Sequence, residues 1–342
     1  MRMVLRLQIL TICTLFALLC SVQGAYSGTI FQENFDSHSD WNADGSKDGV
    51  ECTSPCSSAP EGWTNYRIMP GSGSWSNPPG SIQRLPGNLP DHTTGNGKAY
   101  IVYNESHPVD NWPGDAIISK TFDQDYSELY VRLWIRTQAN WQTVSGAQSK
   151  FFRVLHYDKT GNIFQFFSAG NSCPLFVWDL AVRGSDTSYL TAYRCDPQSS
   201  NYYCTASGVP SYQLNDTFYY WPNGSKAPTA SGMYADTKWH RLDYHFKMND
   251  IGKNNGIMEW SYDGVLMESR VDVQWKSSGS SSSVGWNTFM VGGNSNNSFA
   301  DKADQWYAID DIVVSTTPIT DGGGGGTPVP PNPPADVKIK YQ

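Results

Sequence analysis

Cationic and aromatic side chains occupy every second position of the segment Leu129–Arg136. They are Tyr130, Arg132, Trp134 and Arg136. Guanidinium groups bind carboxylates through charge-assisted hydrogen bonds, and a flat ring with a polar edge stacks on a sugar ring. The pattern therefore indicates a surface that binds an acidic sugar chain. It is equally typical of the solvated face of a β-sheet, where arginine is ordinary.

The segment Arg241–Lys247 carries residues that could transfer protons or neutralise charge. His245 and Lys247 lie on its polar face, whereas Tyr244 lies on the apolar face. Imidazole changes its protonation near neutral pH, and a phenol can also act as acid or base when its surroundings favour it. We therefore take His245, Lys247 and Tyr244 as candidate catalytic residues. The position of Tyr244 makes a role in the core the simpler interpretation for that residue.

A third segment, Lys150–Tyr157, adds Arg153 as a candidate neutralising group and His156 as a candidate acid or base. Apolar residues occupy both sides of its pleat, which is typical of a central strand. The following run, Asn162–Ser168, is expected to pair back as a strand and to place Gln165 among aromatic residues. Gln165 is therefore a candidate substrate-binding residue.

The strongest structural signal is Trp239–Met267, which predicts a β-hairpin. Apolar and polar residues alternate in its first half with the period of two that a half-buried strand requires. A polar turn rich in Asn and Gly follows, and Asp263-Gly264 marks a second, tight turn. One face of this unit must be covered by another sheet, so the pattern predicts a sandwich.

Further short strands are expected at both ends of the domain and between them. They are Thr29–Asp36, Ala99–Tyr103, Asp115–Thr121, Leu175–Val182, Trp286–Val291 and Trp306–Ser315, the last as a partner of the first. Residues 37–96 and 185–238 have no periodic pattern and are expected to be long loops. A loop of such length in a compact domain is usually functional or cross-linked.

The first 24 residues have the form of a secretory signal peptide, with Arg2 and Arg6 followed by an apolar run. We expect a secreted protein, extracellular or periplasmic, and no later run is long enough to span a membrane. Residues 25–317 are expected to form one domain. Residues 318–342, rich in Gly and Pro, are expected to be a linker or tail that could join a further module.

Composition narrows the possible partners and cross-links. The net charge of −8 argues against a nucleic-acid partner. Of seven cysteines, Cys13 and Cys20 fall in the leader, which leaves five, and the pairs Cys52–Cys56 and Cys195–Cys204 are plausible disulfides. The 13 tryptophans fit a sandwich core or sugar stacking.

Acidic residues lie in the two end strands of the expected domain. They are Glu33, Asp36, Asp310 and Asp311. Carboxylate oxygens are the ligands that Ca²⁺ prefers, so these four residues could hold one structural calcium ion. An acidic edge that faces water is an equally good interpretation.

The segment Trp239–Gly264, with the pattern W-x-R-L-x-Y-x-F-K-x-N-D-x-G-x-x-N-G-x-x-x-W-x-x-D-G, resembles the corresponding part of jelly-roll polysaccharide lyases of the glucuronan and alginate lyase group. The closing string WYAIDDIVVS resembles the last strand of the same class. The resemblance implies an all-β fold, a concanavalin A-like jelly-roll sandwich of two antiparallel sheets. Binding modules and glycanases share these motifs, so they specify the fold better than the activity.

In such lyases a basic residue neutralises the uronate carboxylate, and a Tyr or His moves the proton at C5. The R-S/T-E, Q-I/V-H and K-A-G-x-Y blocks of alginate lyases are absent here, and Arg84-Leu85-Pro86-Gly87 only loosely matches a glucuronan lyase block. The catalytic residues are therefore chosen by strand face and chemistry.

The favoured hypothesis is a secreted, monomeric lyase that cleaves an acidic polysaccharide by β-elimination. A non-catalytic carbohydrate-binding module is the alternative. A glycoside hydrolase of the same fold is a further alternative, for which Glu259 lacks an obvious second carboxylate in its strand.

Overall fold

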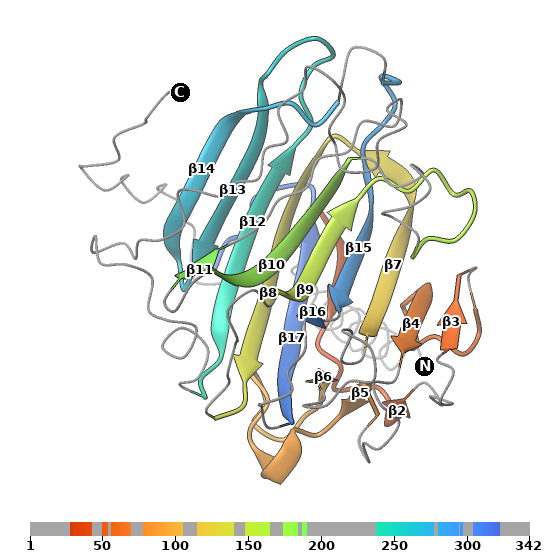
Figure 1. Ribbon diagram of the computed structural model, residues 1–342, viewed down its shortest axis with the longest axis vertical. Helices are drawn as coiled ribbons and strands as arrows, with labels where there is room; N and C mark the ends of the chain where they lie inside the picture. Colours follow the sequence, from red (N-terminus) through yellow and green to blue (C-terminus); the bar gives the residue numbers. More distant parts are fainter. Residues whose placement is uncertain are drawn as a thin grey trace, which may run out of the picture.

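Two antiparallel β-sheets face each other in this protein (Figure 1). The computed structural model describes residues 28–42, 50–53, 56–69, 78–104, 115–139, 148–164, 174–183, 187–189, 237–276, 280–293, 295–296 and 304–321. Within these ranges no helix is long and apolar enough to cross a membrane. The arrangement confirms the predicted all-β sandwich of two antiparallel sheets.

The first sheet, sheet A, has the strand order β14-β13-β12-β8-β17-β6-β5-β2, with β1 beside β17. Its strands are β1 (Thr29–Glu33), β2 (Trp41–Asn42), β5 (Gly80–Gln83), β6 (Ala99–Asn104), β8 (Glu128–Thr137), β12 (His240–Lys247), β13 (Gly256–Tyr262), β14 (Val265–Val273) and β17 (Gln305–Ser315). The first and last strands are paired, as the sequence predicts.

The second sheet, sheet B, has the order β11-β10-β9-β15-β7-β4-β3, with β16 beside β9. Its strands are β3 (Val50–Cys52), β4 (Asn65–Met69), β7 (Asp115–Tyr126), β9 (Gln148–Leu155), β10 (Leu175–Arg183), β11 (Thr187–Tyr189), β15 (Trp286–Gly292) and β16 (Ser295–Asn296). A short 3-10 turn, Pro86–Asn88, lies between β5 and β6.

Strand alternation decides which side chains enter the core. In β12, Leu242, Tyr244 and Phe246 are buried and the residues between them are not. In β8, Val131 and Leu133 are buried in the same way. Because a strand turns successive side chains to opposite faces, the polar residues of both strands lie together on the outer face of sheet A. The predicted hairpin is therefore confirmed.

Aromatic rings fill the space between the sheets. Phe152 of sheet B lies 4.6 Å from Tyr244 and 6.3 Å from Phe246 of sheet A, measured between ring centroids. Trp275 and Trp286 meet edge to face at 5.0 Å. These rings are almost fully buried, and such pairs contribute beyond their buried area.

Local turns fix the strand connections. Asp263 and Gly264 both have positive φ, 48° and 80°, the conformation of a tight hairpin turn between β13 and β14. A β-bulge in β17 falls at Asp310-Asp311, where the strand changes its partner from β6 to β1. Ile309 enters the core before the bulge and Ile312 enters it after the bulge, so the extra residue shifts the alternation by one.

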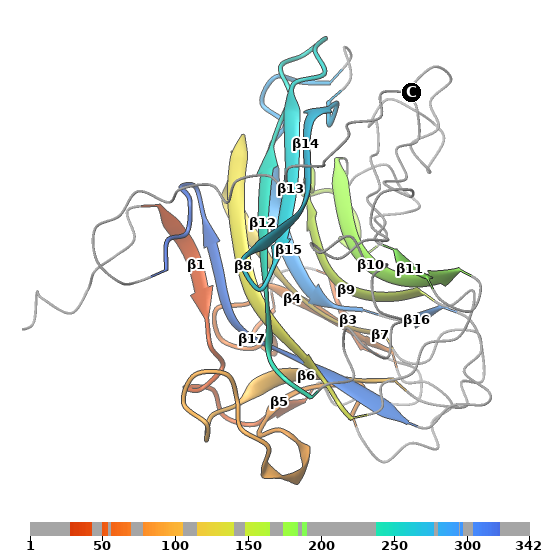
Figure 2. The ribbon, with the colours of Figure 1, turned by 90° about the vertical axis from the view of Figure 1, so that its left-hand side faces the viewer.

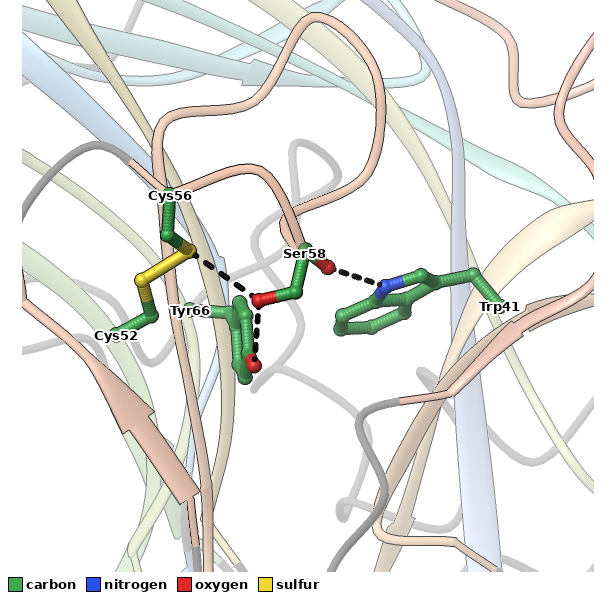
Figure 3. Close-up of a disulfide and its surroundings, with 5 residues drawn as sticks. All are labelled: Trp41, Cys52, Cys56, Ser58 and Tyr66. Atoms are coloured by element: carbon green, nitrogen blue, oxygen red, sulfur yellow. Dashed lines mark hydrogen bonds between the residues drawn. A yellow bond between two sulfur atoms is a disulfide. The ribbon is translucent and has the colours of Figure 1, made fainter.

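The region 37–96 differs from the expected structureless loop, because it contributes β2, β3, β4 and β5. β4 pairs with β7 along five residues inside sheet B. The Cys52–Cys56 disulfide is present, and Figure 3 shows Ser58 between it and Trp41. Short polar strands interrupted by Gly and Pro carry too weak a pattern for detection from one sequence.

Another expectation is corrected at Asn162–Phe164, the described part of the predicted strand at 162–168. These residues form a turn, and Ile163 and Phe164 pack on Leu155 and Met290. Gln165, Cys195–Cys204, the leader and the Gly/Pro-rich tail after residue 321 lie outside the described residues.

Phe152→Ala is expected to lower the free energy of unfolding by about 3–5 kcal/mol, because the vacated site is surrounded by rings that cannot collapse into it. Chemical denaturation would measure the change. Val271→Ala is the matched control, since Val271 is 63% exposed and its truncation should change stability by less than about 0.5 kcal/mol. Similar losses for the two variants would contradict this description of the core.

Candidate functional site

The candidate residues divide between the two outer faces of the sandwich. Tyr130, Arg132, Trp134 and Arg136 of β8 lie beside His245 and Lys247 of β12 on sheet A. Arg153 belongs to β9 of sheet B, and His156 follows that strand. Because the packed core separates the sheets, Arg153 and His156 cannot share one site with His245. The candidate catalytic residues named from the sequence are therefore split between two faces and do not form one site.

Tyr244 is a core residue. It is 3% exposed, and its ring packs against Phe152, Phe176 and Phe246. A side chain enclosed between the sheets cannot touch a polysaccharide. The strand face on which Tyr244 lies therefore excludes the catalytic role proposed for it from the sequence.

His245 is held between two carboxylates on neighbouring strands. Its Nε2 lies 2.8 Å from Oε1 of Glu128 on β8, and its Nδ1 lies 2.9 Å from Oε2 of Glu259 on β13. The imidazole stacks on Tyr130, with ring centroids 4.3 Å apart, and the Tyr130 hydroxyl donates to Glu128. With both ring nitrogens facing acceptors, the doubly protonated imidazolium is the favoured form.

The charges around His245 oppose its use as a base. Burial acts to lower the pKa of His245, but hydrogen bonds to Glu259 and Glu128 outweigh it and raise the pKa above its ordinary value. Burial and the neighbouring Glu128 raise the pKa of Tyr130 as well. Both groups are therefore shifted toward their protonated forms, whereas a general base must be free to accept a proton.

The two glutamates also fail to form a hydrolase pair. Burial raises the pKa of Glu128, but hydrogen bonds from His245 and Tyr130 bring it below the ordinary value. The hydrogen bond from His245 lowers the pKa of Glu259. A glycosidase needs one carboxyl group with a raised pKa as its acid, so this pair does not favour glycoside hydrolysis.

The remaining candidates on sheet A are engaged by neighbours. Nε of Arg132 donates to Asp243 at 2.5 Å, and Nη1 of Arg136 donates to the carbonyl of Pro90 at 3.1 Å. Trp134 stacks on His92 at 3.6 Å between ring centroids. Lys247 is exposed and lies 3.7 Å from a carboxylate oxygen of Glu128. This face therefore carries both cations and acids, many of them joined in ion pairs.

A different set of charges gathers on the outer face of sheet B, which lies on the inside of the bend that both sheets share (Figure 2). We call Arg67, Asp115, Lys150 and Arg153 the Asp115 cluster. Nε of Arg67 lies 3.4 Å from the Asp115 carboxylate, and Nη1 of Arg153 donates to the carbonyl of Gly292 at 2.8 Å. A Cβ on Gly293 would come within 3.0 Å of both Lys150 Cβ and Arg153 Nη2, so these chains are close neighbours.

The Asp115 cluster is strongly desolvated. Arg153 is 1% exposed and Lys150 is 4% exposed. Burial raises the pKa of Asp115, while Arg67, Arg153 and Lys150 lower it and Glu51 raises it. Among the described residues, Asp115 thus lies close to three cations, of which Arg67 also pairs with Glu51 at 3.0 Å. Buried charge of this kind is costly and concentrates at functional sites.

His156 lies at the rim of sheet B, after the end of β9. Its Nδ1 is 2.9 Å from the Asp125 carboxylate and 3.1 Å from the carbonyl of Gly285. Because both groups accept hydrogen bonds, Nδ1 carries a proton, and the tautomer with its single proton there has Nε2 as the acceptor. This is the tautomer that a general base would use.

Among the four acids proposed for calcium, Glu33 is already engaged by three hydrogen-bonding neighbours. Its carboxylate accepts from Phe35 N–H and Trp63 Nε1, and it lies 2.9 Å from His38 Nε2. It is 8% exposed and faces the interior. Glu33 is therefore better described as an anchor of the β1 end than as a metal ligand.

Asp36, Asp310 and Asp311 gather with Asp91 near the bulge of β17. Burial, with Asp311 and Asp91, raises the pKa of Asp310 to about 8. Burial raises the pKa of Asp36, and Asp91 and Asp311 contribute in the same direction. In the described part of the chain, however, no group of three or more His, Cys, Asp or Glu is arranged to hold a metal ion. Calcium stays a prediction.

Sequence reasoning missed the acidic partners of the candidate cations. Asp115, Asp125 and Glu128 come from strands or rims whose pairing one sequence does not reveal. Arg67 lies in a region expected to be a loop. Charge neighbours across strands depend on register, and short polar segments give no register signal.

No family model and no curated protein matches the sequence. Solved structures do. An endo-β-1,4-glucuronan lyase from the fungus Trichoderma reesei has a TM-score of 0.44 and 14% identity, covering 74% of this chain and 94% of that chain. A marine alginate lyase from Aplysia kurodai has a TM-score of 0.41 and 13% identity, covering 85% and 100%.

The carbohydrate recognition domain of Emp47p has a TM-score of 0.39 and 10% identity, covering 73% of this chain and 94% of that chain. The first two neighbours are polysaccharide lyases. The chain is similar to solved jelly-roll lyases, the group that the pattern at Trp239–Gly264 resembles. With TM-scores of 0.39–0.44 and identities of 10–14%, this likeness assigns no activity to the chain.

His245→Asn is expected to lower the free energy of unfolding by about 2 kcal/mol near pH 6 and by less near pH 9. A raised folded-state pKa adds stability that is complete below the unfolded value of about 6.5 and is lost as pH rises through the folded value. Denaturation at several pH values would measure this. An equal loss at every pH would rule out the charged clamp.

Calcium is expected to raise Tm if the acids near the β17 bulge bind it, because a ligand of the native state stabilises by mass action. Thermal unfolding with calcium, with magnesium and with a chelator would measure the shift, and Asp91→Asn should reduce it. An unchanged Tm with millimolar calcium would remove calcium from the description of this protein.

Proposed function

We propose that this protein is a secreted lyase that acts on an acidic polysaccharide at the concave face of sheet B. The observation that carries the proposal is the Asp115 cluster, in which the buried cations Lys150 and Arg153 and the half-buried Arg67 gather around one carboxylate. In a low-dielectric setting such cations interact with a uronate carboxylate far more strongly than in water.

β-Elimination gives these cations a defined role. A base removes the proton α to the carboxylate, and negative charge spreads onto the carboxylate oxygens. The bond to the leaving oxygen then breaks as a double bond forms; the oxygen departs with the bonding electron pair and is protonated by an acid or by water. The proton becomes acidic enough only when that charge is offset by a neighbouring cation. Arg153, Lys150 and Arg67 are the residues assigned to charge neutralisation.

The residue that removes the proton must be sought outside the Asp115 cluster. His156 follows Arg153 by three positions, about 10 Å along an extended chain, so one uronate residue does not reach both groups. The described residues around the Asp115 cluster include no His. The proposal thus assigns the neutralising groups, with His156 and its Asp125 partner as a proton-transfer pair for an adjacent sugar unit.

A second candidate function is glycan binding without turnover. It is favoured by the state of the sheet A face, where His245 and Tyr130 are shifted toward their protonated forms and the arginines are already paired with acids or carbonyls. Such a face can present rings and charges to a sugar chain but lacks a proton acceptor. It predicts affinity with no unsaturated product.

Turnover is expected on a polyuronate. The purified chain would be incubated with glucuronan, alginate, ulvan and pectate while the absorbance of the unsaturated product is followed. Arg67→Gln should raise KM and reduce kcat/KM by about tenfold or more, since a charge-assisted contact of about 1.5–3 kcal/mol is lost.

Lys253→Gln is the matched control, because Lys253 is exposed in the β12–β13 turn and is a cation lost away from the cluster. Its activity should equal that of the wild type. Absence of product on every polyuronate, combined with measurable binding, would replace the lyase by the binding function.

A further inference from the structure

Four charged side chains form a closed ring on the outer face of sheet A. Arg132 and Arg241 each pair with Asp243 through Nε, at 2.5 and 2.8 Å. Nη1 of each arginine then donates to the same oxygen, Oδ1 of Asp321, at 2.8 Å. We call Arg132, Asp243, Arg241 and Asp321 the arginine–aspartate ring. Its positive and negative charges alternate and balance.

Three members of the ring are rigidly placed. Arg132 lies on β8, and Asp243 and Arg241 lie on β12, with Arg132 directly opposite Asp243 in the register. The arginine side chains are 15% and 19% exposed. Because Asp243 holds both guanidinium groups from one side, their Nη1 atoms already converge on a single position. This arrangement is a preformed receptor for one carboxylate.

Asp321, the fourth member, is different. Its side chain is 70% exposed, and it belongs to the segment 316–321 that follows β17. Burial opposes the ionisation of Asp321, but Arg132 and Arg241 outweigh it and lower its pKa, so a carboxylate is bound. The carbonyl of Ile319 also accepts from Arg132, at 3.3 Å. The chain thus places its own carboxylate in the receptor.

Aromatic rings lie on both sides of the receptor. Tyr130 and Trp134 lie two residues before and two residues after Arg132 on β8. One stacks on His245 and the other on His92. Residues two apart on a strand are separated by about 7 Å, which is the scale of a sugar ring. A carboxylate receptor flanked by flat rings suits an acidic sugar better than a peptide carboxylate, which brings no ring face to stack.

We propose that the arginine–aspartate ring is a second, non-catalytic site for the carboxylate of a uronic acid, and that Asp321 is an internal ligand which the sugar displaces. The site lies on the opposite face of the sandwich from the Asp115 cluster, so it stands whether or not the latter cleaves a polysaccharide. Replacing one carboxylate by another keeps the charge balance of the ring.

Competition by Asp321 should be modest. A tethered carboxylate has an effective concentration in the millimolar range, and an exposed ion pair contributes at most about 1 kcal/mol. Removing the Asp321 charge is therefore expected to tighten uronate binding about fivefold. The gain should disappear at high salt, which screens exposed charges.

The test uses two sugars that differ only in the carboxylate, methyl β-glucuronide and methyl β-glucoside. Neither has a glycosidic bond at O4, so neither can be cleaved by elimination. Ligand-observed NMR titration of the full chain would compare wild type, Asp321→Asn and Asp123→Asn. Asp123 is exposed on β7, and its change removes the same charge away from the ring.

The expected result is about fivefold tighter glucuronide binding by Asp321→Asn, no change in Asp123→Asn, and glucoside binding in none. Arg241→Gln, with thermal unfolding as a check of folding, should lose glucuronide binding. Equal affinities for wild type and Asp321→Asn would overturn the proposal, as would an equal gain in Asp123→Asn. Tighter binding of a capped Gly-Asp-Gly peptide than of the glucuronide would overturn the assignment to a sugar.

Discussion

The packing of aromatic rings between the two sheets is the constraint on which the rest of this structure depends. Phe152, Tyr244 and Phe246 meet across the interior, and this contact sets which face of each strand is polar and outward. Two sheets packed in this way stand about 10 Å apart. The polar side chains of the two outer faces are therefore kept apart, although the buried hydroxyl of Tyr307 in sheet A donates to the carbonyl of Lys150 in sheet B. Each outer face must supply a complete site by itself.

Charged residues are arranged differently on the two outer faces. On sheet A, Arg132, His245 and Lys247 each face an acid on a neighbouring strand, so their charges are balanced locally. On sheet B, Lys150 and Arg153 near Asp115 are more deeply buried. Local balance suits reversible recognition, whereas buried cations suit the stabilisation of developing charge.

Much of the fold follows from the sequence because alternation is a local signal. Leu242, Tyr244 and Phe246 define their strand without any knowledge of its neighbours, and Asp263-Gly264 defines its turn in the same way. The candidate site follows less well. The partners of His245 lie 117 and 14 residues away, and which residues become partners depends on strand order and register. The sequence makes both Arg153 and His245 candidate catalytic residues, yet strand order places them in different sheets.

Tyr244 shows that residue types alone do not identify catalytic residues. A phenol beside a histidine reads as a catalytic pair, but the pleat sends adjacent residues to opposite faces. Glu33 illustrates it again, because an acid in an end strand proved to be the hydrogen-bond acceptor for an indole and a backbone amide. In both cases the direction of the side chain within its strand decides whether the residue has a structural or a catalytic role.

The bulge at Asp310-Asp311 affects the surface of β17 more than its core. Before it the inward positions are odd-numbered, as at Tyr307 and Ile309, and after it they are even-numbered, as at Ile312 and Val314. Loss of one of the two aspartates would therefore restore regular alternation and leave both apolar runs facing inward. The extra residue instead lets the neighbouring Asp310 and Asp311 both contact His92, whereas adjacent residues of a regular strand face opposite sides.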